Sequence, residues 1–195
     1  MKRILWAVLL VALALPLAAF ADKSVDFTNS GGTLSGDSSG LTLSGSTLIA
    51  INGINGLQTG DLGTLSFSTG ALTGGNLQSG ATFAAGGSFT IVSNTMGTLF
   101  NGSFDGPVTW SLVTLANGTH NYTLTGSISG TWEGKGTVFG ATVQLTINTG
   151  KGFFNGSTSI SSGDTNVVVP EPGSLTLIGT GLVGLAGVLK RKLKA

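Results

Sequence analysis

The chain has 195 residues, of which only 9% are charged, and it contains 33 glycines and no cysteine. Disulfide bonds and catalysis by a thiolate of this chain are therefore excluded. An apolar content of 41% argues against a chain kept disordered by its charges. Between residues 22 and 169, three lysines stand against seven carboxylates. Because so acidic a segment would not neutralise phosphates, we expect no nucleic-acid partner.

The first 21 residues have the organisation of a secretory signal peptide. Lys2 and Arg3 form a positive start, and residues 4–15 form an apolar run. Ala19 and Ala21 place small side chains at the two positions that signal peptidase requires. We therefore expect a signal helix, export through the Sec translocon, and cleavage by signal peptidase directly after Ala21.

Residues 22–160 alternate short apolar and polar runs with turns of Gly, Asn and Ser, which is typical of β-strands. We predict an all-β exported domain, an antiparallel β-sandwich of the jelly-roll kind. Residues 29–95 have such frequent glycine turns that a partial β-solenoid is an alternative for this first half. The predicted strands are Val25–Thr28, Leu41–Leu43, Thr47–Ile51, Leu62–Ser68, Ser88–Ser93, Thr98–Phe100, Val108–Leu115, Thr119–Ser129, Val138–Asn148 and Gly152–Ile160.

One hairpin is specific enough to predict its register. A three-residue loop over residues 116–118 pairs Leu112 with Tyr122 and Trp110 with Leu124, so that the apolar side chains share a face. A two-residue Asn-Gly loop would put the apolar sets on opposite faces, so we prefer the longer loop. The following strand continues the pattern with five residues that we expect on one face: Phe139, Ala141, Val143, Leu145 and Ile147.

The exported domain offers few groups for catalysis. His120 is the one histidine and stands beside the predicted hairpin loop, where a structural or solvated role is the more common one. A carboxylate pair for glycoside hydrolysis would combine Glu133 with Asp105 or Asp164, but nothing in the sequence brings these residues together. We expect no enzyme, no cofactor and no metal site.

Aromatic side chains allow a carbohydrate interpretation, since their flat faces stack on sugar rings. Trp110 and Tyr122 fall on the apolar face of the hairpin, where packing in the core is their more common role. Trp132 lies in the glycine-rich stretch GTWEGKG and is the better candidate for an exposed sugar contact.

The chain ends in a second membrane element. We expect an extended linker over residues 161–169, then a transmembrane helix, because residues 174–189 carry no charge. As a helix, this run spans about 24 Å, which is short of a hydrocarbon core of about 30 Å. The basic residues from Lys190 onward can extend to the interface and should stay on the cytoplasmic side.

Pro170, Glu171 and Pro172, followed by the short apolar helix and the terminal basic cluster, resemble the PEP-CTERM sorting signal, here over residues 170–195. The resemblance implies a Gram-negative bacterium that makes extracellular polysaccharide. It also implies an exosortase, a membrane enzyme with a Cys nucleophile, which recognises these three residues and removes the tail. The protein would be the substrate of that reaction.

These observations lead to an ordered set of functions. The first is an exported cell-surface or extracellular-matrix protein with a structural or adhesive role, held transiently in the inner membrane with its C-terminus in the cytoplasm. The second is a carbohydrate-binding module of the exopolysaccharide matrix. The third is a secreted enzyme that acts on glycosides.

Overall fold

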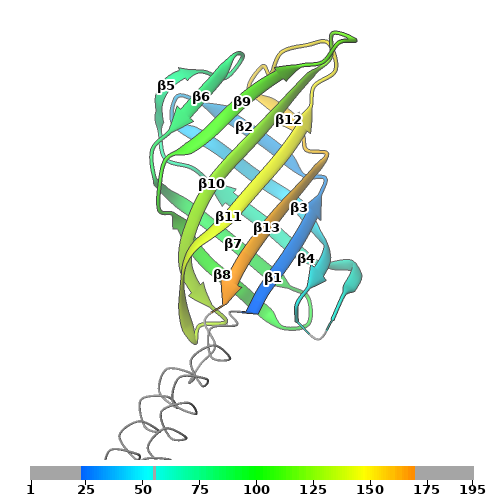
Figure 1. Ribbon diagram of the computed structural model, residues 1–195, viewed down its shortest axis with the longest axis vertical. Coiled ribbons are helices and arrows are strands. Elements are labelled where there is room, and N and C mark those ends of the chain that lie inside the picture. The colour runs from blue at the N-terminus through cyan, green and yellow to red at the C-terminus, as the bar shows by residue number, and fades with distance from the viewer. Residues whose placement is uncertain (1–22, 55, 170–195) are drawn as a thin grey trace, which may run out of the picture. The chain divides into compact units, whose positions relative to one another are not determined.

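The computed structural model describes residues 23–54 and 56–169, and every regular element in them is a β-strand (Figure 1). The predicted signal helix and transmembrane helix lie outside the described residues. The strands are β1 (Lys23–Ser30), β2 (Thr33–Asp37), β3 (Gly40–Asn52), β4 (Gln58–Ser68), β5 (Leu72–Asn76), β6 (Gly80–Phe83), β7 (Gly86–Ser93), β8 (Gly97–Phe104), β9 (Val108–Thr114), β10 (His120–Trp132), β11 (Gly136–Asn148), β12 (Ser157–Ser159) and β13 (Ser162–Val169).

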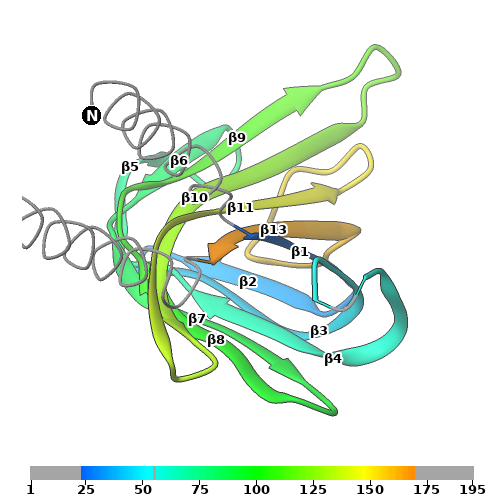
Figure 2. The ribbon, with the colours of Figure 1, turned by 60° about the horizontal axis from the view of Figure 1, so that its bottom comes forward.

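The strands form one sheet that closes on itself. β10 pairs with β8 on one side and β11 on the other, and the ring continues through β13, β1, β3, β4 and β7 back to β8. Figure 2 shows β13 between β11 and β1 in this ring. The all-β prediction is confirmed, but the fold is an eight-stranded antiparallel barrel and not the predicted sandwich. The solenoid alternative is also wrong, since the strands of the first half pair in antiparallel order.

Two long strands connect the barrel to a layer of shorter strands. β10 pairs with β9 through residues 120–125 and with β8 through residues 128–132. β3 likewise pairs with β2 through residues 40–44 and with β1 from Thr47 onward. The register of β3 against β4 shifts near this change of partner, where Gly45 has a φ of 67°. Such irregularities bend a strand and increase its twist, which lets one strand serve two neighbours.

The barrel interior is a packed core. Inward residues of the ring strands are buried, and three phenylalanines from β4, β7 and β8 pack together in the core. The rings of Phe67 and Phe89 lie parallel with centroids 5.9 Å apart, and Phe104 meets both edge-on at 5.8 and 5.9 Å. Parallel displaced and edge-on contacts are the favourable geometries for aromatic pairs. Side chains therefore fill the barrel, as expected for one of eight strands.

The predicted hairpin is confirmed in its register. Leu112 pairs with Tyr122, and Trp110 pairs with Leu124. Gly118 has a φ of 79°, and the amide of Leu115 donates to the carbonyl oxygen of Thr119 over 2.8 Å, which closes the three-residue loop.

The prediction for the next strand is wrong at one residue. Ala141, Val143, Leu145 and Ile147 are buried as expected, but Phe139 is 76% exposed. Ala141 pairs with Ile128 and Val138 pairs with Gly130, so Phe139 and Gly140 together oppose a single residue of β10. This bulge, with Gly140 at a φ of 67°, reverses the alternation and turns Val138 inward instead.

The predicted linker over residues 161–169 is also corrected. Residues 162–169 are extended, but they form β13, which pairs with β11 from Ser162 to Asn166. Gly163, Thr165 and Val167 face inward and are buried. Two of these three inward residues are Gly and Thr, so the alternation that marks a strand was weak in the sequence.

No helix long and apolar enough to cross a membrane occurs among residues 23–54 and 56–169.

The close contact between β8 and β10 in the barrel wall can be tested by adding one side-chain carbon at it. Gly102 and Gly130 face each other, and a Cβ on Gly102 would overlap the carbonyl oxygen of Ser129. We expect Gly102→Ala to lower the free energy of unfolding by about 1–3 kcal/mol, because backbone must move to make room. Gly136→Ala is the matched control, since a Cβ there meets nothing within 4 Å. It should change stability by less than about 0.5 kcal/mol in urea denaturation. Equal stabilities of the two variants would contradict the close approach.

Candidate functional site

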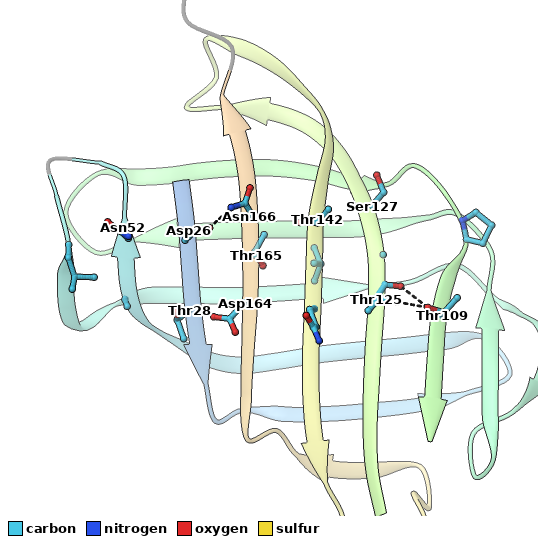
Figure 3. Close-up of a pocket in the computed structure, with 16 residues that line it drawn as sticks. Asp26, Thr28, Asn52, Thr109, Thr125, Ser127, Thr142, Asp164, Thr165 and Asn166 are labelled. Carbon is cyan, nitrogen blue, oxygen red and sulfur yellow. Dashed lines mark hydrogen bonds between the residues drawn. The ribbon is translucent and has the colours of Figure 1, made fainter. Parts of the chain in front are cut away.

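An open groove of about 900 Å³ lies on the outer surface of the barrel (Figure 3). β1, β3, β9, β10, β11 and β13 contribute its lining, which consists mainly of hydroxyl, amide and carboxylate side chains. Successive side chains of a strand point to opposite faces of the sheet, which explains why this outer surface is polar. On β11, Val143 faces the core while Thr142 and Gln144 face out, and on β13 Asp164 and Asn166 flank the buried Thr165.

The strand register arranges these side chains in two rows across the sheet. One row contains Thr109 on β9, Thr125 on β10, Gln144 on β11 and Asp164 on β13, each paired with the next. The neighbouring strands are about 4.8 Å apart. The row therefore presents polar groups at a regular spacing over four strands.

The second row lies beside the first. Ser127 on β10 pairs with Thr142 on β11, which pairs with Asn166 on β13. The Asn166 side-chain amide donates to the Ser24 hydroxyl over 2.8 Å and to the Asp26 carboxylate, both on β1. These hydrogen bonds connect the row to β1, as Figure 3 shows for Asn166 and Asp26.

The charges and contacts in the groove favour a neutral, hydroxyl-rich ligand. Asp26 and Asp164 line the groove, and no lysine or arginine does so among the described residues. An anionic ligand would therefore meet uncompensated negative charge. Within the described part of the chain, Gln144 and Asp164 have no side-chain hydrogen bond, so their polar atoms are free for a ligand. Carboxylate and amide groups together accept from and donate to sugar hydroxyls.

Sequence reasoning missed this groove. The signal was present as outward polar residues two apart, in Thr142-Val143-Gln144 and Asp164-Thr165-Asn166. These outward polar residues indicate a groove only once the strand register is known, because the register places them side by side.

The aromatic residues are placed in or against the core. Trp110 and Tyr122 are buried, and their rings stack with centroids 4.9 Å apart. Their polar atoms donate to the carbonyl oxygens of Leu77 and Gln78 over 2.9 and 2.7 Å. Trp132 is partly buried against the core, with its ring centroid 5.9 Å from that of Phe27, and it does not line the groove. A sugar contact through Trp132 stays a prediction that this placement does not support.

His120 takes a place in the packing. It is 8% exposed, and the Phe153 ring covers it with centroids 4.2 Å apart. Its Nδ1 atom is buried without a hydrogen-bond partner in the described structure. No nucleophile with an adjacent base is formed here.

The three carboxylates considered for glycoside hydrolysis lie in separate surroundings. Asp105 accepts a hydrogen bond from the Ser129 hydroxyl, which holds the pKa of this carboxyl below its ordinary value of 3.8. Glu133 forms an ion pair with Lys135 at 2.8 Å, and Asp164 lines the groove. Among the described residues, no group of three potential ligands of the His, Cys, Asp and Glu types could hold a metal ion.

The groove does contain two carboxylates, those of Asp26 and Asp164. A glycosidase needs one carboxylic acid kept protonated, usually by burial. Both groups are exposed in the described structure, and Asp26 accepts a hydrogen bond from the Asn166 side-chain amide. This arrangement fits binding better than hydrolysis.

The predicted processing sites lie outside the described residues: Ala19 and Ala21 at the N-terminal end, and Pro170, Glu171 and Pro172 at the C-terminal end. In the sequence, the described residues begin and end within a few positions of these sites. β1 begins at Lys23, and β13 ends at Val169, directly before Pro170 in the sequence.

Comparison with known proteins assigns one part of the chain. The family model of the PEP-CTERM protein-sorting motif matches residues 168–192. No curated protein and no solved structure matches the chain. The match confirms the sorting signal and does not extend to the barrel before residue 168.

Proposed function

Because the chain carries a PEP-CTERM sorting motif, which indicates export and processing by an exosortase at the membrane, we propose that it is a structural or adhesive protein of the cell surface or extracellular matrix. The observation that carries this proposal is the sorting motif at residues 168–192, which begins at the end of the last strand of a closed barrel. The barrel is then the cargo, and the motif is the segment that delivers it.

The properties of the barrel support a role outside the cell. A closed ring leaves no sheet edge in the barrel wall for other chains to pair with, which protects an exported protein from aggregation. Its core is continuous and rich in aromatic residues, and its surface carries few charges. It contains no disulfide bond, since the chain has no cysteine. A closed barrel with one continuous core and few charges suits a component of a surface layer or matrix.

Carbohydrate binding is the second candidate, and the groove is the observation that favours it. Two rows of polar side chains offer hydrogen bonds to a chain of hydroxyl groups, and the local negative charge favours a neutral polysaccharide over an anionic one. This function is compatible with the first, since a matrix protein that holds polysaccharide is adhesive. A secreted enzyme acting on glycosides remains the third and least supported candidate.

The sorting route predicts a precursor that depends on exosortase. Cells with the enzyme should contain a mature form without residues 1–21 and without the C-terminal tail. Cells that lack the enzyme should accumulate an inner-membrane form that retains the tail. Fractionation followed by mass spectrometry of the termini measures both. Pro170→Ala combined with Pro172→Ala should reproduce the accumulation in cells that have the enzyme, because the extended shape that proline imposes is lost. Release of full-length chain from enzyme-free cells would contradict this route.

The groove predicts binding of a neutral polysaccharide to the processed protein. In native gels that contain neutral glucans or galactomannans, migration of the wild type should be retarded. Gln144→Ala and Asp164→Ala should each weaken this binding by about tenfold, since each removes hydrogen bonds. Asn101→Ala and Thr98→Ala are matched controls on the exposed face of β8, outside the groove, and should leave binding unchanged. Loss of binding in Trp132→Ala with normal binding by the groove variants would place the sugar contact at Trp132 instead.

A further inference from the structure

The groove is long and narrow, and its long axis crosses the strands. Its lining comes from six neighbouring strands, β9, β10, β11, β13, β1 and β3, and none of them contributes residues over more than three successive positions. Six strands span about 24 Å at the spacing of a sheet, whereas three positions along a strand span about 7 Å. Figure 3 shows the lining side chains spread across the strands in this way. A ligand that fills the groove is therefore an extended chain that lies across the strands.

The floor between the two polar rows carries no outward side chain. The second row continues through Asp26, which pairs with Asn52 of β3, so this row crosses five strands from β10 to β3. Between the rows, Val143 and Thr165 are buried with their side chains toward the core, and Gly126 has no side chain. A flat ring can lie over this floor with one edge toward each row.

Hydrogen bonds at the edges of the rings, and not stacking on their faces, would hold a sugar here. None of the described residues that line the groove is aromatic. Asn52, Thr142 and Gln144 are exposed, and their side chains form no hydrogen bond within the described structure. Binding through hydroxyl groups depends on where a chain places them, so the linkage of the polysaccharide decides whether it fits.

The spacing of the strands selects the kind of chain. In a β-1,4-linked hexopyranose chain, the rings follow one another in a straight, flat ribbon with equatorial substituents along both edges. The rise per ring is close to the strand spacing of about 4.8 Å, so one ring can lie over each strand with its edges toward both rows. An α-1,4-linked chain coils, and its successive rings leave the line of the groove.

We propose that the groove binds a neutral, β-1,4-linked polysaccharide of the glucan or mannan class, laid across the strands with one sugar ring over each strand. This inference rests on the carbohydrate-binding function proposed above and adds to it a linkage, a direction and a length. Because the lining crosses six strands, a chain of about six rings fills the groove.

Titration calorimetry with oligosaccharides of equal length separates linkage from general sugar binding. Protein purified from cells that contain the exosortase is titrated with the β-linked cellohexaose and mannohexaose and with the α-linked maltohexaose. At least one β-linked hexaose should bind about tenfold or more tightly than maltohexaose, because only a β-linked chain keeps its rings over successive strands. The triose of the same β-linked series should bind about tenfold more weakly than its hexaose, because it covers only half of the strands.

Two variants on the outer face of the barrel test the direction of the chain. Asn52→Ala removes a polar group at the β3 end of the second row. Thr146→Ala is the matched control, since Thr146 lies on β11 two positions beyond Gln144, on the same face and outside the groove lining. Asn52→Ala should weaken binding of the β-linked hexaose by about threefold, and Thr146→Ala should leave it unchanged. Circular dichroism checks that both variants are folded.

Three results would overturn this inference and leave carbohydrate binding in place. They are equal affinities for the α-linked and β-linked hexaoses, no binding of either β-linked hexaose by a protein that binds polysaccharide in native gels, and weaker binding in Thr146→Ala with normal binding in Asn52→Ala. The last result would mean that the chain lies along the strands. If no neutral polysaccharide is bound in native gels either, the carbohydrate-binding function is itself wrong, which distinguishes the two failures.

Discussion

The structure depends on the pairing of its first strand with its last. β13 lies between β1 and β11, and the amide of Asn166 reaches Ser24 and Asp26 on β1 across some 140 positions of sequence. A sheet of these strands without that closure would expose two edges and a phenylalanine-rich core. With it, the inward side chains of all eight ring strands share one interior. Because the closing strand is made last, the barrel is completed only when nearly the whole exported segment is available.

Glycine supports this closure at a few defined places. The bulge at Gly140 turns Phe139 out and Val138 in, which lets β11 follow the curve of β10. The direct pairing of Gly102 with Gly130 lets β8 and β10 approach more closely than any side chain would allow. Glycines at these positions thus serve the curvature and close packing of the wall and not only its turns. A closed barrel of eight strands requires strong coiling of its strands, and these residues permit it.

The sequence predicted the local structure well and the pairing of distant strands poorly. The hairpin of β9 and β10 was predictable, since loop length and alternation together left one register that buries Trp110, Tyr122 and Leu124. Alternation alone does not distinguish a sandwich from a barrel, because both need one buried and one exposed face. β13 was missed because its inward residues, Gly163 and Thr165, are hardly apolar. The polar groove was missed because it exists only across strands, whose register no local pattern reveals.

In the sequence, β1 starts and β13 stops within a few residues of the predicted processing sites, and the two strands are neighbours in the barrel. Native-state hydrogen exchange on mature residues 22–169 tests most directly whether β13 closes the barrel. If it does, the β13 amides that pair with β11 will exchange as slowly as those of the central strands, through global unfolding. Exchange of these amides at the rate of the hairpin loop at 116–118 would contradict closure by the last strand.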